Sequence, residues 1–255
     1  MSDPATRLRA AAPILLIALA CAALGALGGW YWEARRLRAD PAARLATADR
    51  AAIEQVVHDY LMAHPEVLPK AMEALERRAT ADRLGAVRGA VERAHPGAVL
   101  GNPAGKVVMV EFTDYACGYC RGSVADVEAL IAANPDLKVV VREMPILTPE
   151  SADAARMALA AAAQGRYAAF HKAMFAAGRP TAQTIAAAAR AAGIDPARAR
   201  QTIAAPETQA ELDRNLELAR QLGFSGTPSW VIGDLAESGA IGREALGAAI
   251  AQARS

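Results

Sequence analysis

Cys117-Gly118-Tyr119-Cys120 follows closely behind a short apolar run, Val107-Val108-Met109-Val110-Glu111-Phe112. The run predicts a buried strand, and the segment after it predicts a helix that opens with the cysteine pair. A thiol in the first turn of a helix lies at the positive end of the helix dipole, which favours the thiolate. Residues three apart lie on one face of a helix, so the two sulfurs come within bridging distance. The pattern therefore indicates a redox-active dithiol.

The same pair could instead be half of a zinc site or two inert buried thiols. Zinc takes about four ligands. The other candidates are a cysteine within an apolar segment and dispersed histidines: Cys21, His58, His64, His95 and His171. The chain has no second Cys-x-x-Cys and no closely spaced histidine pair. We therefore expect redox chemistry by the cysteine pair itself, with no metal and no other cofactor.

Composition bounds the class of protein. The chain has 255 residues, a net charge of +1 and 53% hydrophobic residues, which suits one ordinary domain with extensions. The near-neutral charge gives no electrostatic reason to expect nucleic acid as a partner. With Cys21 set apart, only Cys117 and Cys120 remain. We therefore expect no structural disulfide, and the sole bridge would be the working one.

The N-terminal region predicts a membrane segment. No charged residue stands between Arg9 and Glu33, and about 23 residues at a rise of 1.5 Å suffice to cross a bilayer core. The cluster Trp30-Tyr31-Trp32 suits the membrane interface. We expect a cytoplasmic N-terminus at 1–9 and an uncleaved transmembrane anchor at 10–32. A cleaved signal segment and a lipoprotein signal ending at Cys21 are the alternatives.

The charges that flank this segment favour the opposite orientation, because Arg35, Arg36 and Arg38 follow it and only Arg7 and Arg9 precede it. We give more weight to its position at the N-terminus, since such export segments usually translocate the chain behind them. A dithiol without other cysteines also fits an oxidising compartment. We expect anchoring in the inner membrane, with the catalytic domain in the periplasm.

Residues 40–93 predict a helical stalk. Apolar side chains at spacings of three and four make one face of an amphipathic helix, and they include Ile53, Val56, Val57, Tyr60, Leu61, Val67, Leu68, Ala71, Met72 and Leu75. The pairs His64-Pro65 and Leu68-Pro69 predict two helices rather than one. The apolar face could pack on the catalytic domain or on other copies of the chain. We expect a homo-oligomer through 40–93, because short helices are marginal without partners.

Residues 94–255 predict the catalytic domain. We expect a strand at 107–113, a helix near 119–132 and a strand at 137–143, which make a β-α-β unit. Alanine-rich helical patterns then run from about 150 to 222, with breaks near Gly178, Gly193 and Pro206. The chain returns to a short antiparallel hairpin from Thr227 and ends in a helix from Arg243. The predicted class is α/β.

This order of elements resembles the DsbA family of thioredoxin-fold proteins, in particular its branch of Com1-like and ScsC-like proteins. The active-site segment 110–120 matches that branch nearly throughout. Other matches are Glu143-Met144-Pro145-Ile146-Leu147, Gly226-Thr227-Pro228 and Val231-Ile232-Gly233-Asp234. The stretch 53–75 is similar to the N-terminal helical region of ScsC-like proteins. The resemblance implies a thioredoxin fold with a helical insertion, preceded by a transmembrane helix and an α-helical stalk.

The resemblance also implies roles for site residues. Cys117 would be the exposed attacking thiol and Cys120 the buried resolving thiol. Thr227-Pro228 would be a cis-proline loop that faces the sulfurs and binds the substrate backbone. Glu111 matches a partly buried acid behind the dithiol, although by strand alternation it could equally face solvent.

Three residues beside the cysteines are candidate modulators of the dithiol. Gly118 and Tyr119 form the dipeptide between the sulfurs. Arg121 could add positive charge near the thiolate or be a solvated helix residue. Thr113 and Ala116 depart from the pattern of the branch, which bears on redox poise more than on reaction class.

The implied activity is thiol–disulfide exchange through a mixed disulfide on Cys117. Gly118-Tyr119 and the threonine before the proline resemble isomerase-type members, so we expect a disulfide isomerase or reductase, with a dithiol oxidase as the alternative. Expected partners are exported proteins that contain cysteines and a membrane redox protein of the DsbD or DsbB type. A different class is a copper(I)-binding resistance protein or an anchored scaffold, since copper(I) accepts soft thiolates.

Overall fold

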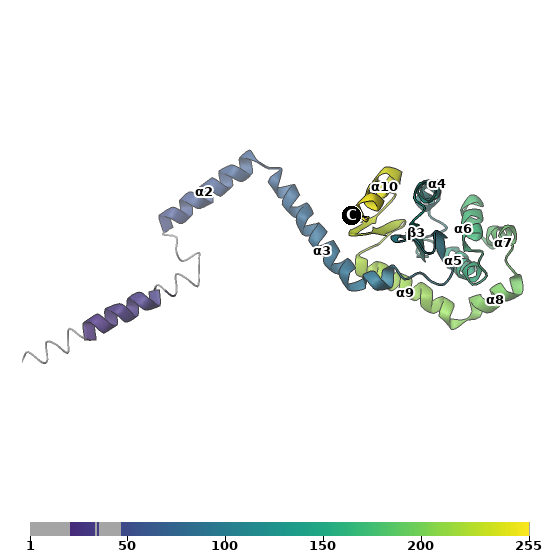
Figure 1. The fold of residues 1–255 in the computed structure, drawn as a ribbon, viewed down its shortest axis with the longest axis horizontal. Helices are drawn as coiled ribbons and strands as arrows, with labels where there is room; N and C mark the ends of the chain where they lie inside the picture. Colours follow the sequence, from purple (N-terminus) through teal and green to yellow (C-terminus); the bar gives the residue numbers. More distant parts are fainter. Residues whose placement is uncertain (1–20, 34, 36–46, 255) are drawn as a thin grey trace, which may run out of the picture. The chain divides into compact units, whose positions relative to one another are not determined.

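The structure is a computed structural model that describes residues 21–33, 35 and 47–254. The chain divides into two compact units, Met1–Met72 and Glu73–Ser255. Figure 1 shows the order of the elements along the chain. The cysteine pair Cys117 and Cys120 lies in the second unit.

The second unit is built on a five-stranded sheet with the order β1-β3-β2-β4-β5. Its strands are β1 (Val99–Gly101), β2 (Val107–Thr113), β3 (Leu137–Glu143), β4 (Ser229–Ile232) and β5 (Leu235–Ser238). Strands β2 and β3 pair in parallel, and the other neighbours pair antiparallel. The predicted β-α-β unit and hairpin are confirmed. Strand β1 has no counterpart among the predicted strands, because its three residues are too few to show a period.

The helices of this unit begin and end where the sequence supplies local signals. They are α4 (Gly118–Ala133), α5 (Pro149–Ala162), α6 (Tyr167–Ala176), α7 (Ala182–Ala191), α8 (Pro196–Ala204), α9 (Pro206–Leu222) and α10 (Gly242–Gln252). Proline stands in the first turn of α5, α8 and α9, where its missing N–H costs nothing. Threonine side chains cap α5 and α7. The helices α5 to α9 occupy the stretch predicted as a helical insertion.

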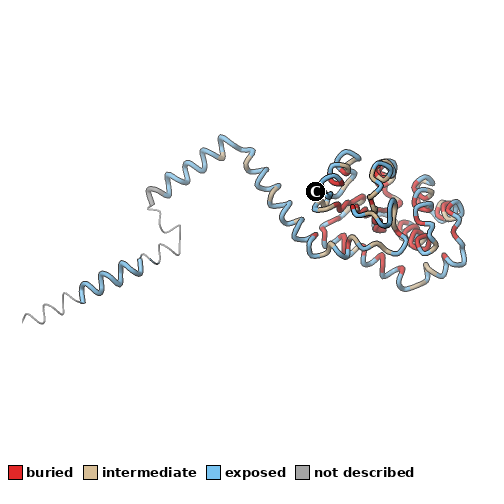
Figure 2. Tube along the Cα trace, viewed as in Figure 1, coloured by how far each residue is buried: buried red, intermediate tan, exposed pale blue. Residues whose placement is uncertain are grey.

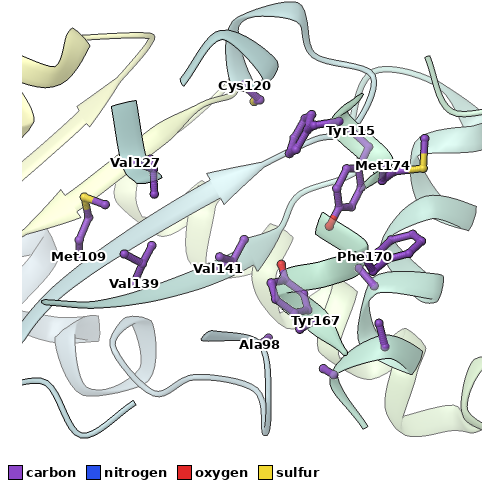
Figure 3. Close-up of a cluster of buried hydrophobic side chains, with 14 of the residues drawn as sticks. Ala98, Met109, Tyr115, Cys120, Val127, Val139, Val141, Tyr167, Phe170 and Met174 are labelled. Carbon is purple, nitrogen blue, oxygen red and sulfur yellow. The ribbon is translucent and has the colours of Figure 1, made fainter. Parts of the chain in front are cut away.

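The central strands bury both faces. Met109, Val139 and Val141 lie in a cluster with residues of α4, α6 and α10. Val110 and Val140 lie in a separate cluster with residues of α3 and α9. Figure 1 shows α4 and α10 on one side of the sheet and α9 on the other. Figure 3 shows part of the first cluster, with Tyr115, Tyr167 and Phe170 beyond the carboxyl ends of the central strands. The active-site segment therefore leaves β2 at the edge of this cluster.

The first unit contains α2 (Thr47–Ala63) and the start of α3 (Val67–Val91). The two helices meet at His64-Pro65, as the sequence predicts, whereas Leu68-Pro69 lies within the first turn of α3 and interrupts nothing. Figure 2 shows α2 and the first part of α3 as almost wholly exposed. The exposed apolar side chains are Ile53, Val56, Val57, Tyr60, Met62, Leu68 and Met72. Such a face lacks a partner within the described chain.

The second half of α3 belongs to the catalytic unit. Leu84 and Val91 are fully buried and lie in a cluster with Leu218 and Phe224. The buried side chain of Arg142 donates to the carbonyl oxygens of Ala90, Val91 and Arg93 and to the carboxylate of Glu211. The structure therefore divides after Met72, whereas the sequence places the domain boundary at 93/94. The sequence predicts all of α3 as stalk, but its second half belongs to the core because it packs on α9 and β3.

The predicted anchor at 10–32 lies partly outside the described residues. Residues 21–33 are helical. Among the described helices, none is both long and apolar enough to span a bilayer.

Candidate active site

Cys117 is the N-cap residue of α4. Its backbone is extended, with φ −77° and ψ 120°, and its sulfur accepts the backbone N–H of Cys120 at 3.3 Å. The N–H groups of the first helical turn have no partner within the helix, so this sulfur occupies one of the positions that an N-cap oxygen usually takes. The Cys117 thiol also donates to the Thr227 carbonyl oxygen at 3.2 Å. A thiolate at this position would accept the hydrogen bond from the Cys120 N–H and would lie at the positive end of the helix dipole.

The two thiols differ in exposure less than the resemblance implies. Both cysteines are free thiols; Cys117 is 5% exposed, and Cys120 is fully buried. The expectation of an exposed attacking thiol is therefore corrected to a nearly covered one. The reason is tertiary, because the Thr227 carbonyl lies against the sulfur. The order of exposure is nevertheless the expected one, since only Cys117 has any open surface.

The Thr227-Pro228 peptide bond is cis, as the resemblance implies. The Pro228 carbonyl oxygen accepts the backbone N–H of Gly239 at 2.7 Å, which ties the loop to the end of β5. Within the described structure, the buried Thr227 hydroxyl has no hydrogen bond of ordinary geometry. The loop thus presents one backbone carbonyl and one hydroxyl to the cysteine pair.

Cys120 is held as a neutral thiol. Burial raises its pKa far above the usual range, and the nearby Glu111 charge raises the pKa further. The hydroxyls of Thr113 and Thr227 and the backbone at Asp114 lower its pKa by smaller amounts. The resolving sulfur therefore needs a proton acceptor before it can attack.

Glu111 is on β2, the strand that leads into the dithiol segment. It is 2% exposed, so the solvent-facing alternative is wrong. Burial raises the pKa of its carboxyl to about 7, and the Thr113 hydroxyl lowers the pKa slightly, although that contact is too loose to be an ordinary hydrogen bond. Glu111 also lines a cavity of about 350 Å³ between α4, α6 and β1, with walls that include Val124, Val127 and Ala168. A buried acid whose pKa is near neutrality can exchange a proton with a neighbouring thiol.

The other predicted modulators have different surroundings. Gly118 is exposed in the first turn of α4, and Tyr119 is 73% exposed. Arg121 donates its Nε to the Phe175 carbonyl oxygen at 3.1 Å, at the carboxyl end of α6. No hydrogen bond joins Arg121 to either sulfur in the described part of the chain. Its contacts are with α6, so it is neither a solvated residue nor a direct partner of the thiolate.

A group of buried polar residues near the site escaped prediction. Glu143 accepts hydrogen bonds from Tyr167 at 2.7 Å and Tyr115 at 3.2 Å, and the Tyr115 hydroxyl lies 3.3 Å from Nδ1 of His171. All four residues are buried. In the sequence, the available signal was Glu143 itself, an acid at the end of the predicted strand and directly before Met144. Its tyrosine and histidine partners come from other segments, so no local pattern could join them.

No group of three or more metal-ligating side chains is placed to hold an ion in the described ranges. The cysteine pair, the cis-proline loop and the buried acid are instead the arrangement of a thiol–disulfide exchange site.

The fold and this site define a thioredoxin-fold oxidoreductase that acts on thiols and disulfides. Residues 108–251 match the family model of the DSBA-like thioredoxin domain, which is more than half of the chain. The chain belongs to that family. Residues 49–81 match the model of the copper resistance protein ScsC N-terminal domain. No curated protein sequence gives a significant match.

Solved structures support the same assignment. A thioredoxin-like oxidoreductase from Silicibacter pomeroyi is 42% identical, with a TM-score of 0.60 over 63% of this chain and 94% of that one. ScsC from Proteus mirabilis, in a transitional conformation, is 26% identical, with a TM-score of 0.61 over 83% of this chain and 97% of that one. The thiol-disulfide exchange protein alpha-DsbA2 from Wolbachia pipientis is 26% identical, with a TM-score of 0.65 over 70% and 97%. The expected family is thus confirmed, including its ScsC-like N-terminal region.

Proposed function

We propose that the protein is a disulfide isomerase or reductase of the periplasm, anchored in the inner membrane through 10–32. The observation that carries the chemistry is the Cys117 sulfur at the N-cap of α4, 3.2 Å from the Thr227 carbonyl oxygen, with Cys120 buried beneath it. A periplasmic thioredoxin-like protein from Salmonella enterica serovar Typhimurium is among the similar structures. That likeness and the apolar N-terminus support the location.

The exchange begins when the Cys117 thiolate attacks one sulfur of a substrate disulfide. The substrate S–S bond breaks, its other sulfur leaves as a thiolate, and Cys117 carries a mixed disulfide. In isomerisation, a second substrate thiolate attacks that mixed disulfide and releases Cys117 with no net transfer of electrons. In reduction, Cys120 gives its proton to Glu111 and attacks Cys117, which releases reduced substrate and leaves a Cys117–Cys120 disulfide. A membrane protein of the DsbD type would then return two electrons.

The direction of exchange is proposed from the surroundings of the dithiol and from the N-terminal helices. The exposed Tyr119 and the Gly118-Tyr119 dipeptide resemble isomerase-type members, and an oligomer would place several dithiols around one substrate. The unpartnered apolar side chains of α2, together with the ScsC-like match at 49–81, support assembly of copies through the stalk. The Thr227-Pro228 loop is the proposed binding edge for the substrate backbone.

Reactivation of scrambled ribonuclease by the full-length protein tests this proposal. We expect reactivation by the wild type, none by Cys117→Ser, and a trapped mixed disulfide with Cys120→Ser. Efficient oxidation of a reduced peptide without reactivation would instead identify a dithiol oxidase with a DsbB-type partner.

The match to a domain named for copper resistance favours one further candidate, copper(I) binding by the reduced dithiol. A competition titration of the reduced full-length protein with copper(I) tests it. Tight stoichiometric binding that Cys117→Ser abolishes, together with negligible reduction of insulin, would favour a copper-binding role over exchange.

A further inference from the structure

Polar residues interrupt an otherwise apolar face at the carboxyl ends of the two central strands. Glu111 and Thr113 alternate with Val110 and Phe112 along β2, so both side chains lie on the face that carries Met109. Glu143 pairs with Thr113 in the parallel register and lies on the same face. Each of these polar residues is at most 2% exposed. Burying two carboxyls together is costly unless they are neutral or hydrogen-bonded.

Glu143 has a directed set of hydrogen bonds. Tyr167 donates to its Oε1, and Tyr115 donates to the same oxygen. A phenol has one proton to give, so if Tyr115 donates to Glu143, the Nδ1–H of His171 donates to the Tyr115 hydroxyl. Burial lowers the pKa of His171 to about 4, which leaves its ring neutral and able to take this tautomer. The result is a chain from His171 through Tyr115 to Glu143.

The middle residue of this chain, Tyr115, stands on the segment that carries the nucleophile. Tyr115 precedes Cys117 by two residues, and its ring packs against Phe170 and Phe175 of α6. The backbone N–H of Cys117 donates to the Asp114 carbonyl oxygen at 3.0 Å. The position of the Cys117 sulfur therefore depends on where Tyr115 is held.

We propose that Glu143 is a positioning residue for the dithiol: it holds the segment before Cys117 through the Tyr115 hydroxyl, and its charge acts on the redox equilibrium of the cysteine pair. This inference rests on the proposed exchange function and gives a role to Glu143, to which the resemblance assigns none. Its second oxygen, Oε2, is buried and has no hydrogen-bond partner among the described residues. That oxygen can carry the proton of the neutral acid.

The electrostatic part of the role follows from the groups around Glu143. Those that face it are Glu111 on β2, Asp114 and Tyr115 in the following loop, and Tyr167 and His171 on α6. Burial raises the pKa of Glu143 to about 8, the two tyrosines lower it, and the charges of Asp114 and Glu111 raise it. Near neutral pH the acid is mostly protonated. Above pH 8 its negative charge adds to that of Glu111, which faces Glu143 and already raises the pKa of the Cys120 thiol, and so disfavours a thiolate in the reduced form.

Two measurements on the full-length protein test the two parts of the proposal, the positioning of Cys117 and the effect of the Glu143 charge. The rate of Cys117 alkylation by iodoacetamide at pH 6, where Glu143 is neutral, reports positioning. We expect Glu143→Leu to change this rate by about threefold or more, because two phenols lose their acceptor. Glu143→Gln should restore the wild-type alkylation rate, since an amide oxygen accepts both bonds.

The equilibrium constant with glutathione at pH 6 and pH 9 reports the effect of the Glu143 charge. We expect Glu143→Gln to match the wild type at pH 6 and to favour the reduced form by about threefold at pH 9.

Matched variants keep the test decisive if Glu143→Leu fails to fold. Tyr167→Phe keeps the shape of the side chain but removes one donor to the Glu143 carboxylate. Since that hydrogen bond lowers the pKa of Glu143, its loss should shift the pH dependence of the glutathione equilibrium to higher pH. Glu211→Gln removes another buried acid, which lies with Arg142 on the opposite face of the sheet, and should leave both readouts unchanged. Identical alkylation rates and equilibrium constants in wild type and Glu143 variants, or an equal shift in Glu211→Gln, would overturn the inference. A wild type that forms no Cys117–Cys120 disulfide defeats the proposed function instead, while the alkylation rates still decide the positioning.

Discussion

Glu111→Gln replaces a buried carboxyl by an amide of nearly the same shape, so its effect isolates the ionisation of Glu111. The pKa of this carboxyl rises from 4.5 to about 7 because of burial. In the unfolded chain the group ionises near pH 4.5, whereas the folded protein keeps its proton until about pH 7. The proton therefore stabilises the folded state at low pH, and this stability is lost as the pH rises from 4.5 to 7.

The size of the effect follows from the same shift. Each pH unit between the two pKa values costs the folded wild type about 1.4 kcal/mol. Much of that cost is already present at pH 7, and it reaches a plateau of roughly 3 kcal/mol above pH 8. Glutamine does not ionise, so Glu111→Gln escapes the cost. We expect the stability of the variant relative to wild type to increase by about 2.5 kcal/mol between pH 5 and pH 9.

Urea unfolding of the reduced full-length protein at these two pH values measures the difference. Trp230 is a suitable fluorescent probe, because it is fully buried and pairs with Glu111 across β2 and β4. Below pH 6.5 the unfolded chain protonates His171 while the folded protein keeps the ring neutral until about pH 4, which lowers stability. Wild type and variant share this loss, so it cancels in the comparison. A difference that stays constant from pH 5 to pH 9 would refute the reasoning.

Glu211→Gln is the control of opposite sign. Burial raises the pKa of Glu211, but the His95 ring, 3.8 Å away, and the charges of Arg142 and Arg214 lower it by more, so its net pKa is below 4.5. Its carboxylate therefore stabilises the folded state above that range, and the stability is lost at acidic pH. The variant should be less stable than wild type at pH 7 and should approach it in acid.

The remaining predictions concern the framework of the site. Leu84→Ala should lower the free energy of unfolding by about 2–5 kcal/mol. Leu75→Ala on the same helix, where the side chain is 67% exposed, should change it by about 0.5 kcal/mol or less. Denaturant midpoints compare the two variants, and equal losses of stability would contradict the placement of α3. Arg142→Met should cost about 3–5 kcal/mol, because Glu211 loses the buried one of its two arginine partners and the carbonyl oxygens of Ala90, Val91 and Arg93 lose their donor. A thermal melt of the variant checks this. Removal of residues 1–72 should yield a monomer by light scattering that still exchanges disulfides with glutathione; an unchanged oligomer mass would show that assembly does not use the stalk.

The local sequence was sufficient for most elements and for the sulfurs. The apolar runs of β2 and β3, the prolines that open α5, α8 and α9, and the spacing of Cys117 and Cys120 are signals carried by neighbouring residues. Such signals act through backbone preferences and side-chain period, which need no knowledge of the rest of the chain. The cis state of Thr227-Pro228 was accessible only through the resemblance, since X-Pro sequences are mostly trans.

Other features required segments far apart in the chain to meet. Strand β1 exists because it pairs with β3, and Glu111 is buried because α4 and α6 cover its face of the sheet. Tyr167 reaches Glu143 from 24 residues away, and Arg142 reaches the end of α3 from about 50. The sequence by itself determined the class of fold and the reactive pair, because those follow from local pattern. Tertiary structure alone decided which acids lose their water, and with it the protonation of the groups around the dithiol, because desolvation depends on everything packed around a side chain.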